Sequence, residues 1–294
     1  MAGVSRRDLA PTAALVGVTA IWGSTFVVVK DAVAEMPVTD FLTWRFAIAG
    51  LVMLALRPRS VAALGRTGRR NGFVVGLALG TGYLLQTLGL QHTSAANSGF
   101  ITGMFVVLTP LCAAVLLRRP PGRGAWAAVV VATIGLGLLS LHGFSVGTGE
   151  LLTFGCAAAF ALHIIGLGEW AQHHDAFGLA VVQLLTTAVL CGIVAVPGGL
   201  ALPPDAGVWG ALALTALAAT ALAFVVQTWA QSHLAPTRAA VIMTMEPVFS
   251  GIFAVVVGNE QLGPRTLTGA ALVLGAMLLA EVGSPPPKVE RLEV

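Results

Sequence analysis

Residues 71–117 read NGFVVGLALGTGYLLQTLGLQHTSAANSGFITGMFVVLTPLCAAVLL and contain no Asp, Glu, Lys or Arg. A helix that crosses a membrane needs about 20 mostly apolar residues, so this stretch is long enough for two such helices. The polar residues 91–98 (QHTSAANS) divide it into two parts. We therefore predict two consecutive membrane-spanning helices here.

The composition of the whole chain points to the same surroundings. Of the 294 residues, 56% are hydrophobic and 10% are charged, whereas a soluble domain carries about 25% charged residues. The net charge of +3 is too small to indicate a nucleic-acid partner. Cys112, Cys156 and Cys191 have neither disulfide nor metal-ligand spacing. We expect an all-α polytopic membrane protein in a lipid bilayer, with no cofactor and no metal site.

Charge-poor stretches of similar length recur along the chain and predict ten transmembrane helices. The predicted spans are 9–29, 41–56, two within 71–117, 124–141, 151–168, 176–196, 206–230, 238–257 and 264–280. Thirteen of the sixteen Lys and Arg residues fall in segments on the side of the N-terminus, whereas the opposite loops hold Lys30 and Arg265. Because Lys and Arg are enriched in cytoplasmic loops, we expect both termini in the cytoplasm. Fourteen Arg against two Lys is typical of a GC-rich bacterial genome, which indicates a bacterial plasma membrane.

The two halves of the chain carry matching patterns. The matched pairs are 83–87 (YLLQT) with 224–228 (FVVQT), Pro110 with Pro247, and Gly135 with Gly275. These matches divide the chain into two five-helix repeats, 11–141 and 149–282, followed by a predicted cytoplasmic tail at 283–294. Because five is an odd number, the second repeat is inverted relative to the first. Inverted repeats are typical of alternating-access carriers, which bind solutes near the bilayer midplane.

Several motifs resemble the EamA-type ten-helix members of the drug/metabolite transporter superfamily. They are WGSTF at 22–26, Arg45-Phe46, GLQHTSAAN at 89–97, Met245-Glu246-Pro247, GNE at 258–260 and GAALVLG at 269–275. The resemblance covers about residues 11–282 and implies two inverted repeats around a central cavity, together with transport of small metabolites or drugs. It also implies export as the more frequent direction. One motif departs from the family pattern, because Arg118-Arg119 replaces a Gly-x-Glu after the fourth span.

Glu246 is the foremost candidate for a site residue. An ionised carboxylate in the bilayer centre costs several kcal/mol unless it is paired or protonated. The following Pro247 has no backbone N–H and tends to kink a helix. We interpret Glu246 either as a substrate contact or proton-coupling group, or as the structural partner of an arginine. Pro110, the repeat mate of Pro247, follows Thr109 and not an acid.

Other polar and aromatic residues deep in the predicted spans complete a candidate cavity. Gln86 and Gln227 are equivalent by the repeat, and their amides bind either a solute or neighbouring helices. His163 is the repeat equivalent of Thr25 and is interpreted as a proton relay or as a core histidine. The remaining candidates are Trp22, Tyr83 and Trp229 as aromatic walls or packing residues, and Asn97 as a cavity group or helix cap.

Arg45 lies near the outer end of the second predicted span. Three interpretations stay open for its side chain: it snorkels to the membrane interface, it pairs with Glu246, or it attracts an anionic substrate. Its repeat mate is the uncharged Gln183.

Together these features predict a secondary carrier, an exporter of small organic solutes, with protons as the candidate coupling ion. An intramembrane enzyme is one alternative and would use Ser24 with His163, but neither residue lies in a nucleophile motif. A channel is another alternative, although no filter-like polar loop is visible. No nucleotide-binding motif is present. We therefore expect transport and no enzymatic activity.

Overall fold

The computed structural model describes residues 6–116, 118, 123–142, 145–233 and 242–282, so the predicted tail lies outside the described residues. These residues are helical apart from loops and a small hairpin of β1 (Leu141–His142) and β2 (Ser145–Val146). The first half contains α1 (Arg6–Glu35), α2 (Val38–Leu56), α3 (Ser60–Ala63), α4 (Gly65–Leu90), α5 (Ala95–Thr102), α6 (Phe105–Leu116) and α7 (Arg123–Ser140).

The second half repeats this order of helices. It contains α8 (Thr148–Trp170), η1 (Ala171–His173), α9 (Ala176–Ala195), η2 (Val196–Gly198), α10 (Ala206–Ala213), η3 (Leu214–Leu222), α11 (Ala223–His233), α13 (Met245–Val256) and α14 (Pro264–Val282). The segments α10, η3 and α11 form one continuous rod whose middle part, η3, has π-helical hydrogen bonding. Among the described residues, seven helices are long and apolar enough to cross a membrane, and three further apolar helices are shorter. The predicted all-α polytopic fold is thereby confirmed.

Two of the spans predicted as continuous are interrupted. The fourth span is broken into α5 and α6 by a turn at Gly103 and Met104. The ninth span has a turn at Thr244, directly before α13, so Glu246 is the second residue of a helix and not the middle of a longer one. The first span is longer than predicted, because α1 continues past Val29 to Glu35.

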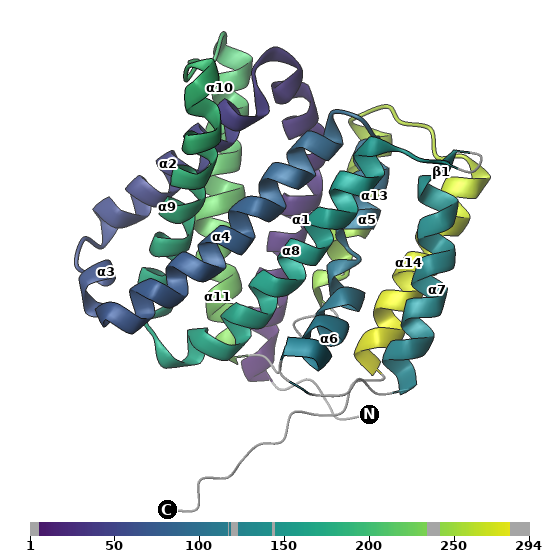
Figure 1. The fold of residues 1–294 in the computed structure, drawn as a ribbon, viewed down its shortest axis with the longest axis horizontal. Helices are drawn as coiled ribbons and strands as arrows, with labels where there is room; N and C mark the ends of the chain where they lie inside the picture. Colours follow the sequence, from purple (N-terminus) through teal and green to yellow (C-terminus); the bar gives the residue numbers. More distant parts are fainter. Residues whose placement is uncertain (1–5, 117, 119–122, 143–144, 234–241, 283–294) are drawn as a thin grey trace, which may run out of the picture.

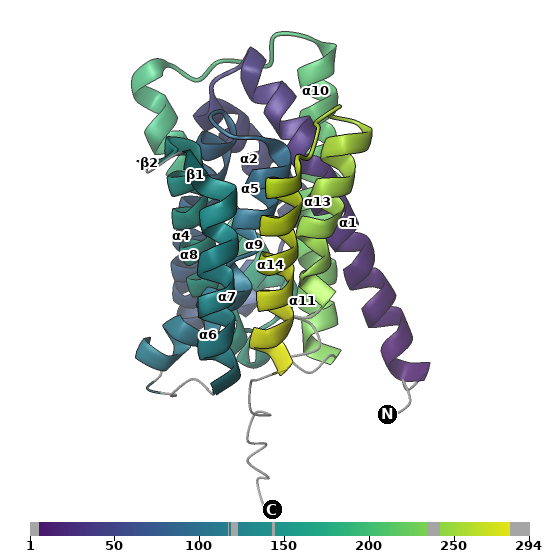
Figure 2. The ribbon, with the colours of Figure 1, turned by 90° about the vertical axis from the view of Figure 1, so that its right-hand side faces the viewer.

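The packing of the helices is symmetric between the two halves. α7 packs on α14 and α2 packs on α9, and each pair joins helices at the same position of the two repeats. The contact of α1 with α13 is matched by that of α8 with α6, and the contact of α4 with α9 is matched by that of α2 with η3. Figure 2 shows α7 and α14 side by side, and Figure 1 shows that α1 begins at the end of the bundle opposite β1. The two five-helix repeats therefore run in opposite directions.

Small residues allow the helices of the two halves to approach closely. A methyl group built on Gly72, Gly76 or Gly80 of α4 would lie 2.8, 2.6 and 2.9 Å from side-chain atoms of α9. Glycine spacing of four residues places these positions on one face of α4, as in other tightly packed membrane helices. The contact between α4 and α9 thus depends on the absence of side chains at these positions.

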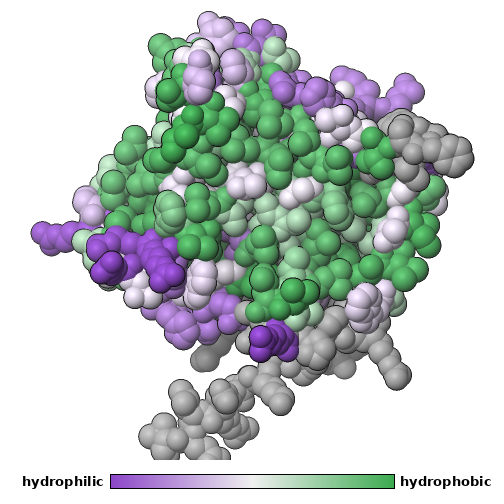
Figure 3. All heavy atoms as spheres, viewed as in Figure 1, coloured by the Kyte–Doolittle hydropathy of each residue, from purple (hydrophilic) through white to green (hydrophobic). Residues whose placement is uncertain are grey.

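Hydrophobic side chains cover the middle of the face seen in Figure 3, and hydrophilic ones lie toward its edges. Large apolar residues such as Leu51, Phe73, Ile134 and Val189 are exposed on the molecule. A surface of this kind matches a bilayer core flanked by two aqueous interfaces. The exposed arginines 57, 59, 66, 69 and 70 lie around α3, at the end of the bundle where α1 begins.

Candidate functional site

A central cavity lies between the two halves and contains about 540 Å³ of atom-free space, part of it open to solvent. The first half contributes Trp22, Thr25, Phe26, Leu79, Tyr83, Gln86 and Phe105, and the second half contributes Phe160, His163, Ile164, Phe224, Gln227, Met243 and Glu246. Seven of the nine predicted substrate-contact residues meet here, and their role in binding stays a prediction.

The walls of the cavity repeat the symmetry of the sequence. Trp22, Thr25 and Phe26 occupy the same positions in α1 that Phe160, His163 and Ile164 occupy in α8, each pair being separated by 138 residues. Tyr83 and Gln86 in α4 are related in the same way to Phe224 and Gln227, with a separation of 141. Equivalent groups therefore line the cavity from both halves, as expected for a site on the axis between inverted repeats.

Both interrupted spans contribute residues at their interruptions. Phe105 follows the turn between α5 and α6, while Met243 and Glu246 flank the turn at Thr244. Pro247 has no N–H to donate to the preceding turn of the helix. Broken helices at the midplane are a recurring way to bring backbone and side-chain polar groups into a transport site. Phe105 and Met243 were not predicted as site residues. Gly103 and the two prolines in these spans were the sequence signal for the interruptions at which both residues lie.

Polar groups without partners face the cavity from the second half. The Glu246 side chain is 8% exposed, and the described residues provide no hydrogen bond or ion pair to its carboxylate. Gln227 donates from Nε2 to the Met243 sulfur at 3.8 Å, and its Oε1 is buried without a partner. Gln86 differs, because its Nε2 donates to Thr102 Oγ1 at 3.2 Å. Unpaired polar atoms in a membrane interior are costly, and a bound solute would satisfy them.

His163 borders the cavity but is tied to the helix behind it. Its Nε2 lies 2.7 Å from Gln183 Oε1, and its exposed fraction is 3%. This contact makes His163 Nε2 the donor and leaves Nδ1 as an acceptor. Ser24, its partner in the enzyme alternative, donates instead to the carbonyl of Ile21 at 2.7 Å within its own helix.

The π-helical segment η3 presents two groups to the first half. The Trp22 indole N–H donates to the carbonyl of Ala219 at 2.8 Å. The Arg45 Nε donates to Thr220 Oγ1 at 2.9 Å. π-Helical turns widen the helix and change which carbonyls are free, and they are frequent at functional sites. The wall of the cavity is therefore joined to η3 by one hydrogen bond from α1 and one from α2.

Arg45 does not snorkel to the interface, which corrects one of the sequence interpretations. The side chain is 2% exposed, and its guanidinium carbon lies 4.9 Å from the centre of the Tyr83 ring and 5.5 Å from that of Phe46. Pairing with Glu246 is also wrong, because the two residues form no ion pair among the described contacts. The guanidinium points inward because α2 is packed against α9 and η3 on this side.

A second, smaller cavity lies beside the central one, with about 230 Å³ of atom-free space that is partly open to solvent. Its lining residues Val29 and Leu90 belong to the last two turns of α1 and the last turn of α4. The smaller cavity is lined by Arg45, Thr87, Val29 and Leu90, together with Thr25, Phe26 and Gln86. The last three residues also line the central cavity. The two cavities are therefore neighbours with a common wall.

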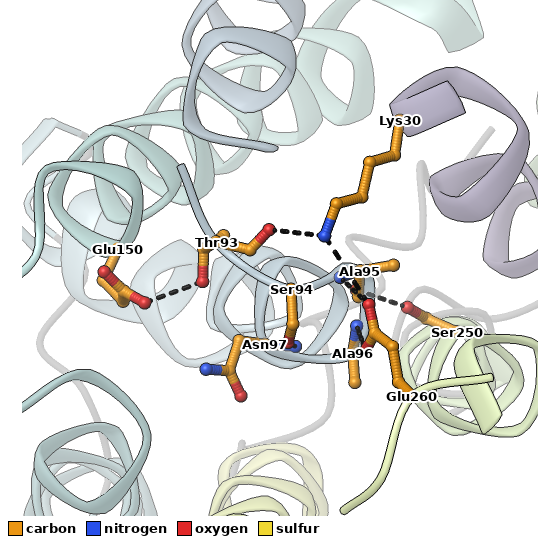
Figure 4. Close-up of polar contacts among 9 residues, drawn as sticks. All are labelled: Lys30, Thr93, Ser94, Ala95, Ala96, Asn97, Glu150, Ser250 and Glu260. Carbon is orange, nitrogen blue, oxygen red and sulfur yellow. Dashed lines mark hydrogen bonds and ion pairs between the residues drawn. The ribbon is translucent and has the colours of Figure 1, made fainter. Parts of the chain in front are cut away.

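A network of polar contacts closes the bundle beyond the smaller cavity (Figure 4). Lys30 Nζ donates to the carbonyl of Thr93 at 3.0 Å and lies 3.7 Å from Glu260 Oε1. The two oxygens of Glu260 accept from the backbone N–H groups of Ala95 and Ala96 at 2.7 and 3.2 Å. A carboxylate at the first N–H groups of a helix is stabilised by the helix dipole. Glu260 of the second half thus holds the start of α5 in the first half.

A second carboxylate binds the same turn. Thr93 Oγ1 donates to Glu150 Oε1 at 2.7 Å, and Glu150 belongs to the first turn of α8. Ser250 of α13 adds a hydrogen bond from Oγ to the carbonyl of Ala95 at 3.1 Å. We call Lys30, residues 93–96, Glu150, Ser250 and Glu260 the closing network. The hydrogen bonds from its second-half side chains all end on residues 93–96, which comprise the end of the loop after α4 and the first residues of α5.

Two predicted site residues lie elsewhere. Asn97 belongs to the first turn of α5 beside the closing network; its Nδ2 donates to the carbonyl of Leu139 at 3.5 Å. Asn97 is not the cap of this helix either, because Ser94 Oγ accepts the N–H of Asn97 at 3.0 Å. Trp229 is 41% exposed and lies outside the lining of both cavities.

Comparisons with known proteins agree with this architecture. The model of the EamA-like transporter family matches residues 11–141 and again residues 147–281. An uncharacterized transporter of Archaeoglobus fulgidus is 34% identical over 266 residues, which are 90% of this chain and 83% of that protein. The uncharacterized transporter YyaM of Bacillus subtilis is 24% identical over 281 residues, covering 90% of this chain and 92% of the relative.

A solved crystal structure has the same fold with a TM-score of 0.65 and 20% sequence identity, covering 92% of this chain and 96% of the other. Two matches to one family model, one in each half, agree with the five-helix repeats seen in the packing. The chain is a multi-pass membrane transporter that belongs to the EamA-like family of the drug/metabolite transporter superfamily.

Proposed function

We propose that this transporter is a secondary carrier that exports small organic solutes by alternating access, with the central cavity as the solute site. The observation that carries the proposal is the symmetric lining of that cavity, to which both inverted repeats contribute equivalent residues. A site on the axis between such repeats becomes accessible from either side when one half rocks against the other. The cavity walls combine aromatic rings with unpaired polar oxygens, which suits a small amphipathic solute.

The closing network supports a direction for the cycle. It joins the two halves at the end of the bundle opposite the start of α1, so this end is closed in the described conformation. By the distribution of arginines, that end faces outward and the N-terminus faces the cytoplasm. We place the protein in a bacterial plasma membrane, where a cavity closed to the outside would load solute from the cytoplasm.

Glu246 is the candidate for coupling to protons in this scheme. Its carboxylate lies in the cavity at the start of α13 without a described partner. A carboxyl group in such surroundings is stable when protonated or when a cationic group of the solute is beside it. Alternation between these two states would exchange a proton for a solute.

Solute flux into proteoliposomes tests the proposal. The solute is first selected as a compound that raises the melting temperature of the purified protein in a metabolite panel, and its radiolabelled form is then used for flux. We expect Glu246→Gln and Gln227→Ala to abolish flux while the variants still fold and insert. Glu35→Gln and Gln172→Ala change the same residue types at exposed positions and should transport normally.

Undiminished flux by both cavity variants would exclude the central cavity as the solute site. Internal pH is recorded in the same vesicles with an entrapped dye. Flux that does not respond to an imposed proton gradient would remove proton coupling and leave the carrier itself in place.

A further inference from the structure

Arg45 holds a buried positive charge that no described carboxylate neutralises. The ion pairs among the described residues are Lys30 with Glu260 and Arg57 with Asp175, both away from Arg45. The neighbours of the guanidinium are the Thr220 hydroxyl and the rings of Tyr83 and Phe46. These groups are polar or aromatic, and none carries a negative charge. A guanidinium in a membrane interior is normally paired with an anion or marks a solute pathway.

The guanidinium of Arg45 has more N–H donors than its described neighbours accept. It carries five N–H groups in one plane; Thr220 Oγ1 accepts the one on Nε at 2.9 Å, and the Tyr83 side chain is a second hydrogen-bonding neighbour. Arg45 also lines the smaller cavity. Thr220 and the ring of Tyr83 hold the side chain in place, so its orientation is fixed before a ligand arrives. This is a built site and not a flexible surface arginine.

The position of the smaller cavity connects Arg45 to the proposed solute site. Thr25, Phe26 and Gln86 line both cavities, so these side chains are what separates a solute in the central cavity from Arg45. Glu246 lines the central cavity and is absent from the lining of the smaller one. The two buried ionisable side chains therefore line different cavities.

We propose that the smaller cavity is an anion subsite in which Arg45 binds a carboxylate group of the transported solute. The inference rests on the proposed function, because it assumes that the central cavity holds the body of the solute. Planar guanidinium groups bind carboxylates and phosphates by paired hydrogen bonds. The lining of the two cavities contains one cationic side chain, Arg45, which matches the single charge of a carboxylate and would leave a phosphate dianion with excess negative charge.

Matched pairs of acids and amides test this subsite on the purified full-length protein. The probes are 3-phenylpropanoate with 3-phenylpropanamide, benzoate with benzamide, and hexanoate with hexanamide, each followed by thermal unfolding and by equilibrium binding. The two members of a pair have nearly the same shape and differ in charge. We expect at least one acid to raise the melting temperature more than its amide in the wild-type protein.

Arg45→Gln should remove this preference and weaken acid binding by about tenfold or more, the effect of losing one charge-assisted contact. Arg45→Lys keeps the positive charge but lacks the planar guanidinium. Its preference for acids over amides should lie between those of the wild-type protein and Arg45→Gln. Arg57→Gln is the matched control, since it removes an arginine from an exposed ion pair and should leave the preference unchanged.

Two results would overturn the subsite: no acid binds better than its amide in the wild-type protein, or the preference survives Arg45→Gln. If Arg45→Gln does not fold, the wild-type comparison and the Lys variant still decide between these outcomes. Acid binding that depends on Arg45 in a protein without solute flux would refute the carrier function and retain the subsite. Flux of a neutral solute that is unaffected by Arg45→Gln would refute the subsite and retain the carrier function.

Discussion

Glu260 controls the opening of the bundle if the closing network is the outer closure of the carrier. The perturbation is Glu260→Gln, which keeps the size of the side chain and removes its charge. Glu260 accepts two backbone N–H groups at 2.7 and 3.2 Å and lies 3.7 Å from Lys30. Glutamine retains one oxygen acceptor, so one hydrogen bond at the start of α5 is lost and the other becomes neutral. The closed conformation is thereby destabilised relative to an open one.

The magnitude follows from the character of these contacts. A hydrogen bond to a charged group contributes about 1.5–3 kcal/mol, and a neutral one contributes about 0.5–1.5 kcal/mol. The ion pair adds less than about 1 kcal/mol, because the side chains of Lys30 and Glu260 are 38% and 18% exposed. The sum is at least about 2.5 kcal/mol, which shifts the equilibrium between closed and open forms by about 70-fold or more.

The assay is the reaction of a cysteine in the smaller cavity with a membrane-impermeant thiol reagent added outside. Thr87 is 1% exposed and lines that cavity, so Thr87→Cys reports opening. The three native cysteines are replaced first. We expect Glu260→Gln to accelerate the labelling by about the factor above. Asp31→Asn, an exposed carboxylate nearby on α1, should leave the rate unchanged. An unchanged rate in Glu260→Gln, or an equal acceleration in Asp31→Asn, would refute the assignment of the closing network.

Three further changes test the packing and the helix ends. Gly76→Ala places a methyl group 2.6 Å from a side chain of α9 and should destabilise the protein by about 1–3 kcal/mol in thermal unfolding, whereas Gly168→Ala meets nothing within 4 Å and should be neutral or stabilising. Trp22→Phe leaves the carbonyl of Ala219 without its indole donor and should lower stability by about 1–2 kcal/mol, with solute affinity measured in parallel. Asp205→Ala removes the N-cap of α10, which accepts the N–H of residue 208 at 2.9 Å, and should cost about 1 kcal/mol and speed hydrogen exchange at that amide.

The membrane spans and the paired glutamines were predictable because they depend on local patterns. Hydrophobic length alone separates a spanning helix from a loop. Residues 91–94 separate α4 from α5, whereas residues 95–98 of the predicted dividing stretch already belong to α5. Gln86 and Gln227 were identified through the repeat, which places both in equivalent turns of equivalent helices. A site on a symmetry axis is lined by equivalent residues from both repeats. An internal duplication in the sequence therefore indicates lining residues before the fold is known.

Arg45 and Asn97 show what a local pattern does not determine. Arg45 is close to a helix end in the sequence, and its burial results from η3 and α9 packing against α2 on that side. Nothing local to Arg45 indicates that Thr220 lies opposite it. Asn97 lies in the first turn of α5. The orientation of this helix about its own axis is set by hydrogen bonds with Ser250 and Glu260 from the other half. Long-range contacts decide both positions.

The closing network relates one departure in the repeats to the proposed direction of transport. The second half has Gly258-Asn259-Glu260 after its fourth helix, where Asn259 takes a φ of 52° and the N–H of Glu260 bonds to the carbonyl of Ala254. This turn directs the carboxylate to the start of α5. The first half has Arg118-Arg119 at the equivalent place, and an arginine side chain has no acceptor for helix N–H groups. Inversion of the repeats places that position at the other end of the bundle. The carboxylate is therefore present at one end of the bundle and missing from the sequence at the other. For the proposed carrier we expect two conformations of unequal free energy, with the one closed at the Glu260 end favoured when no solute is bound.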